Sequence, residues 1–309
     1  MELNPHVTVL LQELVSWIIT DKNGIYLDGT VGYGGHSEAI LKKISSDGKL
    51  IGMDLDPYAL KYSEKRLSSL QKSYSLHNGN FKEYPYLLQS LKVDKVAGII
   101  FDLGFSSGQL DAEHRGFSFQ SNAPLDMRFN PKVGLTAKEL LHKLTRKEIS
   151  LLIKEYGEER LYRKISNNIV NAIKSNKMNT TFDLKNAVEK CVNPRYLNKS
   201  LARVFQSIRI KVNNEIDALK EALNSSINFL GKGGRIAVIS FHSLEDRIVK
   251  KFFKDSSILC VCPNSFPICT CETNPTLKIL TKKAIIPNQK ECDLNSRSRS
   301  AKLRVAERI

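Results

Sequence analysis

The sequence predicts an α/β fold in which a Rossmann-like parallel sheet is interrupted by an inserted all-helical segment. Between residues 25 and 102, short apolar runs alternate with segments of helical periodicity in four strand–helix units. This alternation is typical of a parallel sheet with helices on both faces. Residues 136–229 have helical periodicity without a convincing strand, and the strand–helix pattern resumes at residue 235. The order of elements therefore predicts one sheet domain split by a helical domain.

The elements before the insertion are expected in a regular order. The apolar stretch at 7–19 is interrupted by Gln12 and Glu13 and lacks a basic leader, so it predicts an amphipathic helix rather than a signal peptide. The expected strands are 25–28, 50–53, 74–77 and 96–101. The three helices between them are expected around 40–44, 57–70 and 84–91.

Capping and turn signals define the later elements. In the insertion, Thr145 with Glu148 and Thr181 with Asp183 have the spacing of helix starts, and Asn193-Pro194 marks a stop. A long helix is expected through Ile216, Leu219 and Leu223. The glycine-rich stretch 231–234 predicts a tight turn into a strand at 235–240, followed by a helix at 244–253. The last strands are expected at 277–280 and 301–305, paired antiparallel.

The glycine-rich turn after the first strand indicates a nucleoside site. Residues 29–36 lack the Gly-Lys-Ser/Thr ending of a P-loop, and Ser37 stands where a dinucleotide fingerprint has its last glycine. Asp54 ends the second strand twenty residues after Gly34, the offset at which an acid binds ribose hydroxyls. S-adenosylmethionine (SAM) has a ribose but no phosphate, so we expect SAM as cofactor and Asp54 as its ribose ligand. The alternative is a plain strand-to-helix turn.

Three acids are expected at one edge of the sheet. Asp28, Asp54 and Asp102 each end a predicted strand, and ligands of open α/β sheets bind beyond the carboxyl ends of the strands. The polar loop 103–111 follows Asp102, and loops in this position often carry function. A carboxylate there would face both the methyl group of SAM and its acceptor. We therefore predict Asp102 as the catalytic residue.

The net charge of +15 is concentrated in the predicted insertion. Residues 115–215 contain 20 lysines and arginines against 9 aspartates and glutamates, a surplus of 11. This concentration favours a nucleic-acid partner over the alternative that lysines only solvate helix faces. Six cysteines without a dense framework suit a reducing cytoplasm, where we expect the protein, and no stretch is long enough to span a bilayer.

Longer motifs are spread over nearly the whole chain. They lie at residues 6–13, 28–36, 102–104, 106–107, 109–111, 115–119, 124–128, 240–247 and 296–304. Together they resemble the MraW/RsmH family, the bacterial 16S ribosomal RNA cytosine-N4 methyltransferases. The resemblance implies a class I SAM-dependent methyltransferase sheet in two parts, 1–114 and 216–309, around a basic, substrate-binding helical domain at 115–215. The SAM contacts that it implies are Gly34, Gly35, His36, Asp54, Phe81, Asp102 and Gln109.

The resemblance also implies a substrate cytidine in the decoding region of 16S ribosomal RNA. Many amino-methyltransferases have Asn or Asp followed by two prolines and an aromatic residue, whereas Asp102 is followed here by Leu-Gly-Phe. This departure leaves the proton acceptor open. A cytosine-C5 enzyme would need a cysteine nucleophile, and residues 1–190 contain none. The other readings are methylation of another RNA position, such as a ribose hydroxyl, and a non-catalytic RNA-binding assembly factor.

Several side chains have two possible roles. A flipped base could stack on an aromatic ring, or the same rings could belong to the core; the candidates are Phe105, Phe117, Phe119 and Phe241. His242 is a candidate on the substrate side or a helix cap. Three cations could bind RNA or solvate an edge strand; they are Arg297, Arg299 and Lys302.

Four cysteines raise the question of a structural metal. They are Cys260, Cys262, Cys269 and Cys271, and they form two C-x-C pairs. These pairs could bind a structural zinc, or their loop could be a packed excursion. The resemblance to the MraW/RsmH family does not call for a metal in catalysis, so we expect none there.

Overall fold

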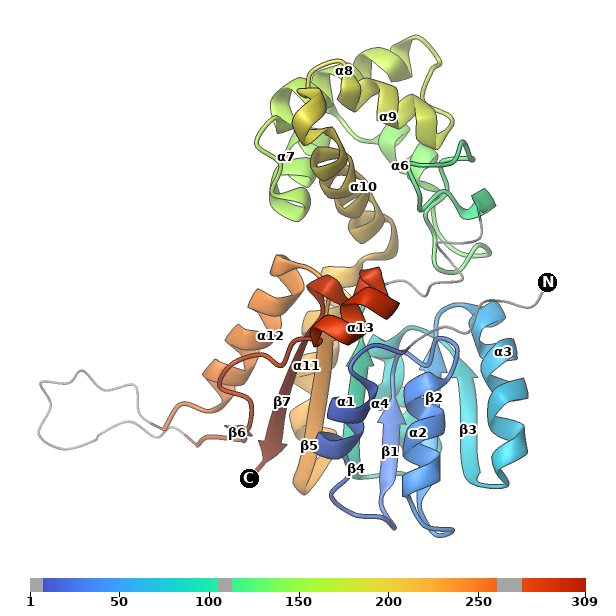
Figure 1. The fold of residues 1–309 in the computed structure, drawn as a ribbon, viewed down its shortest axis with the longest axis vertical. Helices are drawn as coiled ribbons and strands as arrows, with labels where there is room; N and C mark the ends of the chain where they lie inside the picture. Colours follow the sequence, from blue (N-terminus) through green and yellow to red (C-terminus); the bar gives the residue numbers. More distant parts are fainter. Residues whose placement is uncertain (1–7, 105–112, 260–273) are drawn as a thin grey trace, which may run out of the picture. The chain divides into compact units, whose positions relative to one another are not determined.

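The computed structural model describes residues 8–104, 113–259 and 274–309 (Figure 1). The chain divides into two compact units, one formed by residues 1–104 and 217–309 and the other by 105–216. The division after Gly104 falls earlier than residue 114, where the sequence analysis placed it, and the second division follows residue 216. In the described part of the chain, none of the helices combines the length and the apolar character needed to cross a bilayer.

The first unit is built on a seven-stranded sheet in the order β3-β2-β1-β4-β5-β7-β6. Its strands are β1 (Ile25–Asp28), β2 (Lys49–Asp54), β3 (Ser73–Asn78), β4 (Val96–Asp102), β5 (Leu230–Ser240), β6 (Leu277–Ile279) and β7 (Lys302–Arg308). Strands β1 to β5 pair in parallel, as predicted. Strand β7 runs antiparallel to both β5 and β6, which confirms the expected pairing of the last strands.

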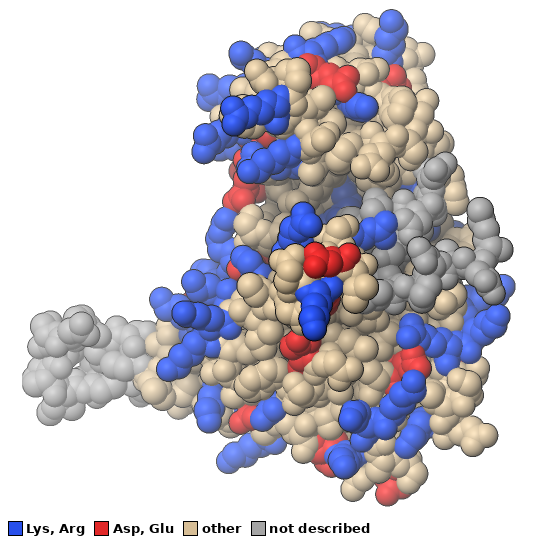
Figure 2. All heavy atoms as spheres, in the orientation of Figure 1, with Lys and Arg blue, Asp and Glu red and all other residues tan. Residues whose placement is uncertain are grey.

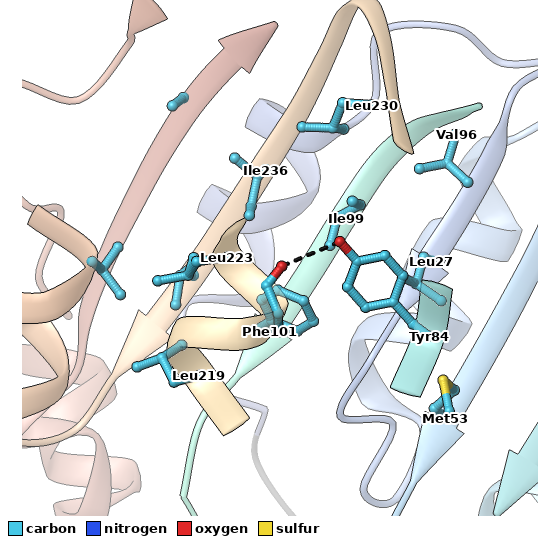
Figure 3. Close-up of a cluster of buried hydrophobic side chains, with 14 of the residues drawn as sticks. Leu27, Met53, Tyr84, Val96, Ile99, Phe101, Leu219, Leu223, Leu230 and Ile236 are labelled. Atoms are coloured by element: carbon cyan, nitrogen blue, oxygen red, sulfur yellow. Dashed lines mark hydrogen bonds between the residues drawn. The ribbon is translucent and has the colours of Figure 1, made fainter. Parts of the chain in front are cut away.

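Helices pack on both faces of this sheet because successive strand residues point to opposite sides. On one face, Tyr26 of β1 belongs to a buried cluster with residues of α1 (Leu11–Ile18), α2 (Gly35–Lys43) and α3 (Pro57–Leu67). On the other face, Leu27 belongs to a cluster with residues of α4 (Tyr84–Ser90), α11 (Glu215–Phe229) and α12 (Ser243–Ser256). In this second cluster, the hydroxyl of Tyr84 donates a hydrogen bond of 3.1 Å to the carbonyl of Ala222 (Figure 3).

Two details of the first unit differ from the sequence prediction. Residues 231–234, expected as a turn, lie inside β5, whose pairing with β4 shifts register between Val96 and Gly98. Gly233 has a φ of +77° there, so this glycine serves a strand irregularity. The unit also contains the short elements η1 (Ser68–Leu70), η2 (Phe81–Glu83), α13 (Gln289–Leu294) and η5 (Ser296–Ser300), of which only η1 lies inside a predicted helix.

The second unit is helical. Its elements are η3 (Glu113–Arg115), α6 (Ala137–Lys143), α7 (Arg146–Gly157), α8 (Tyr162–Lys174), α9 (Thr181–Glu189), η4 (Pro194–Tyr196) and α10 (Leu197–Asn213). Thr145 and Glu148 form the predicted capping box at the start of α7. The prediction for α9 was wrong by one residue, because Thr180 caps this helix with Asp183. Phe117 and Phe119 pack in the apolar core of this unit, so both are core aromatics.

Candidate functional site

The carboxyl ends of three neighbouring strands bring Asp28, Asp54 and Asp102 together. Register pairs Asp28 with Gly52 of β2 and with Ile100 of β4, so the other two acids lie two residues beyond it on either side. The negative charge of Asp102 acts on Asp28, and that of Asp28 acts on Asp54. The predicted gathering of these acids at one edge of the sheet is therefore present.

Asp28 is a structural member of this group. Its side chain is buried, and it accepts hydrogen bonds from the Ser37 hydroxyl (2.6 Å) and from the Thr30 N–H (3.1 Å). Burial raises the pKa of Asp28, while the bond from Ser37 opposes this rise. Ser37, which the sequence analysis used to argue against a dinucleotide fingerprint, thus ties α2 to the end of β1.

In the glycine-rich turn, one glycine is required by close packing and another has open space beside it. A Cβ on Gly35 would collide with Oγ1 of Thr8, so the start of α2 needs glycine for close packing. Gly32 has a φ of +53°, and within 4 Å a Cβ there would meet, among the described residues, only the Thr30 carbonyl at 3.9 Å. The Ser63 hydroxyl fixes this part of the turn by donating 2.6 Å to the Gly32 carbonyl. The turn therefore leaves room for a ligand beside Gly32.

Asp54 faces this turn and holds it. Its Oδ2 accepts the N–H of Gly32 at 2.7 Å, and its Oδ1 accepts the N–H of Asp56 at 2.8 Å. Burial raises the pKa of Asp54 to about 6, although both hydrogen bonds lower it. A carboxylate has about four lone-pair sites, so each oxygen retains one for a ligand. Two adjacent hydroxyls of a ribose fit such an acceptor pair.

His36 and Asp102 form the second part of the site. His36 is only 5% exposed, and its Nε2 lies 3.5 Å from Oδ2 of Asp102. Neither ring nitrogen of His36, nor Oδ1 of Asp102, forms a hydrogen bond with a described residue, although all three atoms are buried. The N–H of Asp102 donates 2.6 Å to Oγ1 of Thr30, which fixes the end of β4. Buried polar atoms normally have partners, so these atoms are free to contact a ligand.

The remaining predicted cofactor residues lie at different places. Gly34 is the N-cap of α2 with a φ of +77°. Phe81 begins η2, directly after β3, and its ring centroid lies 5.3 Å from that of Phe101. Gln109 lies outside the described residues, as does Phe105.

Three other candidates have structural contacts. His242 caps α12, because its Nδ1 accepts the N–H of Glu245 at 3.4 Å and its Nε2 lies 3.0 Å from the Glu245 carboxylate. Phe241 is partly buried against the cluster that contains Tyr26. Lys302 pairs with Asp246 at 3.2 Å, so it stabilises the fold.

Arg297 and Arg299 are exposed in η5. The four cysteines considered for zinc lie outside the described residues. Among the residues that the structure describes, no group of three or more His, Cys, Asp or Glu side chains could hold a metal ion.

Three residues that hold the site were not singled out as site residues in the sequence analysis. Thr8, Thr30 and Ser63 come from the segment before α1, the glycine-rich turn and α3. Thr8 and Thr30 lie within the stretches 6–13 and 28–36 that carry the family resemblance, but the role of each of the three residues depends on contacts across 27, 72 or 31 positions of the chain. Only the tertiary structure reveals these contacts.

The strand order, with β7 antiparallel beside β5, and the acids at the carboxyl ends of β1, β2 and β4 define a class I methyltransferase, the class that uses SAM. The chain belongs to the MraW methylase family, whose model matches residues 3–309. A ribosomal RNA small subunit methyltransferase H from Caldicellulosiruptor saccharolyticus is 46% identical over 305 residues, covering 98% of this chain and 99% of the relative. A protein of the same name from Clostridium botulinum is 45% identical over 306 residues, with the same coverage.

Proposed function

We propose that the protein transfers the methyl group of SAM to the exocyclic N4 amine of a cytidine in the decoding region of 16S ribosomal RNA. The names of its relatives support a small-subunit RNA substrate. The observation that carries the chemistry is the unpaired, buried Oδ1 of Asp102 beside His36. Such a protein would act in the cytoplasm, where small subunits are assembled.

The proposed cofactor contacts fit the donors and acceptors of the site. Asp54 accepts the ribose hydroxyls with the lone pairs that Gly32 and Asp56 leave free. Gly34, Gly35 and His36 at the start of α2 line the same edge, and Phe81 offers an apolar ring after β3. Gln109 completes the proposed set. SAM, when bound there, supplies a methyl group on a positively charged sulfur.

Asp102 supplies what a cytosine amine needs. The N4 lone pair is delocalised into the ring, so the amine is a weak nucleophile. Oδ1 of Asp102 accepts a hydrogen bond from N4–H and orients the lone pair toward the methyl carbon. The same carboxylate would take up the amine proton when the amine accepts the methyl group from SAM. An acceptor of this kind contributes about 10²–10⁴-fold, and positioning about 7–11 kcal/mol.

The helical unit is proposed to bind the RNA. Residues 115–215 carry the surplus of 11 positive charges, and Figure 2 shows lysine and arginine side chains gathered on the visible face of this unit. Each RNA phosphate that a cation neutralises releases counterions and adds salt-dependent affinity.

The test is methyl transfer from labelled SAM to small-subunit particles, followed by mass spectrometry of the modified nucleosides. Wild-type protein is expected to produce N4-methylcytidine. Asp102→Asn keeps the shape of the side chain but removes the carboxylate that accepts the proton. The turnover of this variant should fall by about 10²–10⁴-fold at unchanged RNA affinity. Asp94→Asn, at an exposed acid of the same unit, is the control. A wild-type rate for Asp102→Asn would remove Asp102 from the mechanism.

Two other readings have different outcomes in the same experiments. A methylated ribose or another base would show that the enzyme acts on another RNA position. Absence of SAM binding in calorimetry would favour a non-catalytic assembly factor.

A further inference from the structure

We propose that a pocket between α12 and β6 in the sheet unit binds an unstacked nucleotide of single-stranded RNA. This RNA site would be separate from the SAM site. The inference rests on the proposed function, because it assumes that RNA is the substrate.

The pocket has apolar walls and the size of a ligand site. Its volume is about 480 Å³, within the range of small-molecule sites. Phe253 and Leu277 line it as buried side chains, and Ile279 and the terminal Ile309 add further apolar surface. Phe253 is only 2% exposed, so a base would bind by apolar contact with Ile279 and Ile309 rather than by stacking on an aromatic ring.

The rim of the pocket carries four exposed lysines. Lys250 and Lys254 lie four residues apart on α12, so both project from one face of the helix. Lys278 on β6 and Lys282 after it lie on the other side of the pocket. No ion pair joins these four to any residue in the described part of the chain. Figure 2 shows blue side chains gathered where α12 lies in Figure 1.

The hydroxyl groups of the lining are already engaged. Oγ1 of Thr281 accepts the N–H of Val305 at 2.9 Å, and the Ser257 hydroxyl donates 2.9 Å to the Lys254 carbonyl. Arg304, which also lines the pocket, is paired with Asp246 at 2.6 Å. The lining therefore offers the edge of a base few free hydrogen-bond partners. We expect a site that tolerates any base.

Charge complementarity favours a polynucleotide as occupant. The lysines flank the apolar walls on two sides, so a base in the pocket would have cations near the phosphates before and after it. This combination of apolar surface and cations is typical of single-strand binding. An acidic protein segment would satisfy the lysines, but it would not fill a pocket of this size with flat apolar surface.

The position of the pocket indicates an anchor rather than a catalytic role. Leu277 pairs with Arg308 of β7, near the edge of the sheet where the parallel strands begin. Asp54 and Asp102 lie at the opposite edge, where these strands end. Loss of the pocket should therefore weaken RNA binding and leave turnover at saturating RNA unchanged.

The test measures binding of fluorescein-labelled oligouridine by anisotropy at several salt concentrations. Lys250→Glu with Lys254→Glu should weaken binding about tenfold at physiological salt, since two lost phosphate contacts reduce the salt slope by about 1.4. The matched control is Lys61→Glu with Lys65→Glu, which makes the same charge change at exposed positions of α3. The control should bind within about twofold of wild type.

A second variant tests the apolar wall with little risk to folding. Ile309 is 44% exposed, and Ile309→Ser should weaken oligouridine binding several-fold at an unchanged salt slope. Photo-crosslinking of RNA that contains 4-thiouridine should label peptides of α12 or β6 in wild type, and less so in this variant.

The outcomes separate this inference from the proposed function. Equal losses in the pocket variant and its control, or wild-type binding by both, would overturn the inference. Displacement of oligouridine by poly-glutamate as readily as by unlabelled RNA would also overturn it and assign the pocket to an acidic protein segment. If wild-type protein neither binds nor methylates RNA, the proposed function itself fails. Normal turnover at saturating RNA with a raised KM in the pocket variant supports both.

Discussion

The affinity for SAM should fall as the pH falls through about 6, because Asp54 must be ionised to hold the ribose. Burial raises the pKa of Asp54 to about 6 from its ordinary value of 3.8. The ionised carboxylate has a free lone pair on each oxygen beside the Gly32 and Asp56 N–H groups. A proton on either oxygen removes the charge and one of these acceptors. Lower pH therefore weakens binding, and higher pH restores it.

The size of the effect follows from this pKa. At pH 7 roughly a tenth of Asp54 is protonated, and at pH 5 roughly nine tenths is protonated. If only the ionised form binds, the Kd for SAM should rise about tenfold between pH 7 and pH 5, which is about 1.4 kcal/mol. S-adenosylhomocysteine has the same ribose, so its Kd should change in parallel.

Isothermal titration calorimetry of wild type and Asp54→Asn between pH 5 and pH 8 checks this reasoning. The variant cannot ionise at this position, so its affinity should be weaker than that of wild type at pH 7 and nearly constant over this range. Asp47→Asn, an exposed acid in the loop before β2, is the matched control and should follow wild type. A flat wild-type curve, or an equal pH dependence in Asp54→Asn, would refute the assignment of Asp54 as the ribose ligand.

Two further predictions concern the helical unit and the fold. Lys174→Glu with Lys177→Glu, at exposed positions in and after α8, should weaken RNA binding about tenfold and reduce its salt slope by about 1.4 in anisotropy titrations; unchanged RNA affinity would give the helical unit another purpose. Asp246→Asn should lower the free energy of unfolding in urea by roughly 2–4 kcal/mol, because it leaves Arg304 partly buried without its partner. Asp255→Asn, which breaks the exposed ion pair with Lys251, should lower the free energy of unfolding by less than about 1 kcal/mol. Equal losses in the two variants would contradict the argument.

Local patterns were sufficient to predict most elements of the fold. The apolar strand that ends at Asp102 and the capping box of Thr145 are encoded within a few residues, so each was found at its predicted place. The stretch around Gly233 was read as a turn because glycine signals turns and strand bulges alike. The pairing of β5 with β4, which decides between them, depends on residues more than a hundred positions apart.

The candidate site divides in the same way. Asp54 could be predicted because the offset from a glycine-rich turn to the next strand end is a local property of a βα unit. The engagement of Asp28 by Ser37 and the proximity of His36 to Asp102 could not be predicted, because they depend on side-chain directions. A helix cap was one of the two roles considered for His242, and the structure shows this role.

The sequence by itself determined the alternation of strands and helices, the acids at the strand ends and the concentration of positive charge in the insertion. Neighbouring residues encode these properties, because their periodicity and spacing do not depend on the rest of the chain. Only the tertiary structure decided which acid is engaged inside the fold and which retains free acceptors. It also brought Lys250, Lys278 and their neighbours around one apolar pocket. Burial and pairing arise between segments that are distant in sequence, so no local pattern records them.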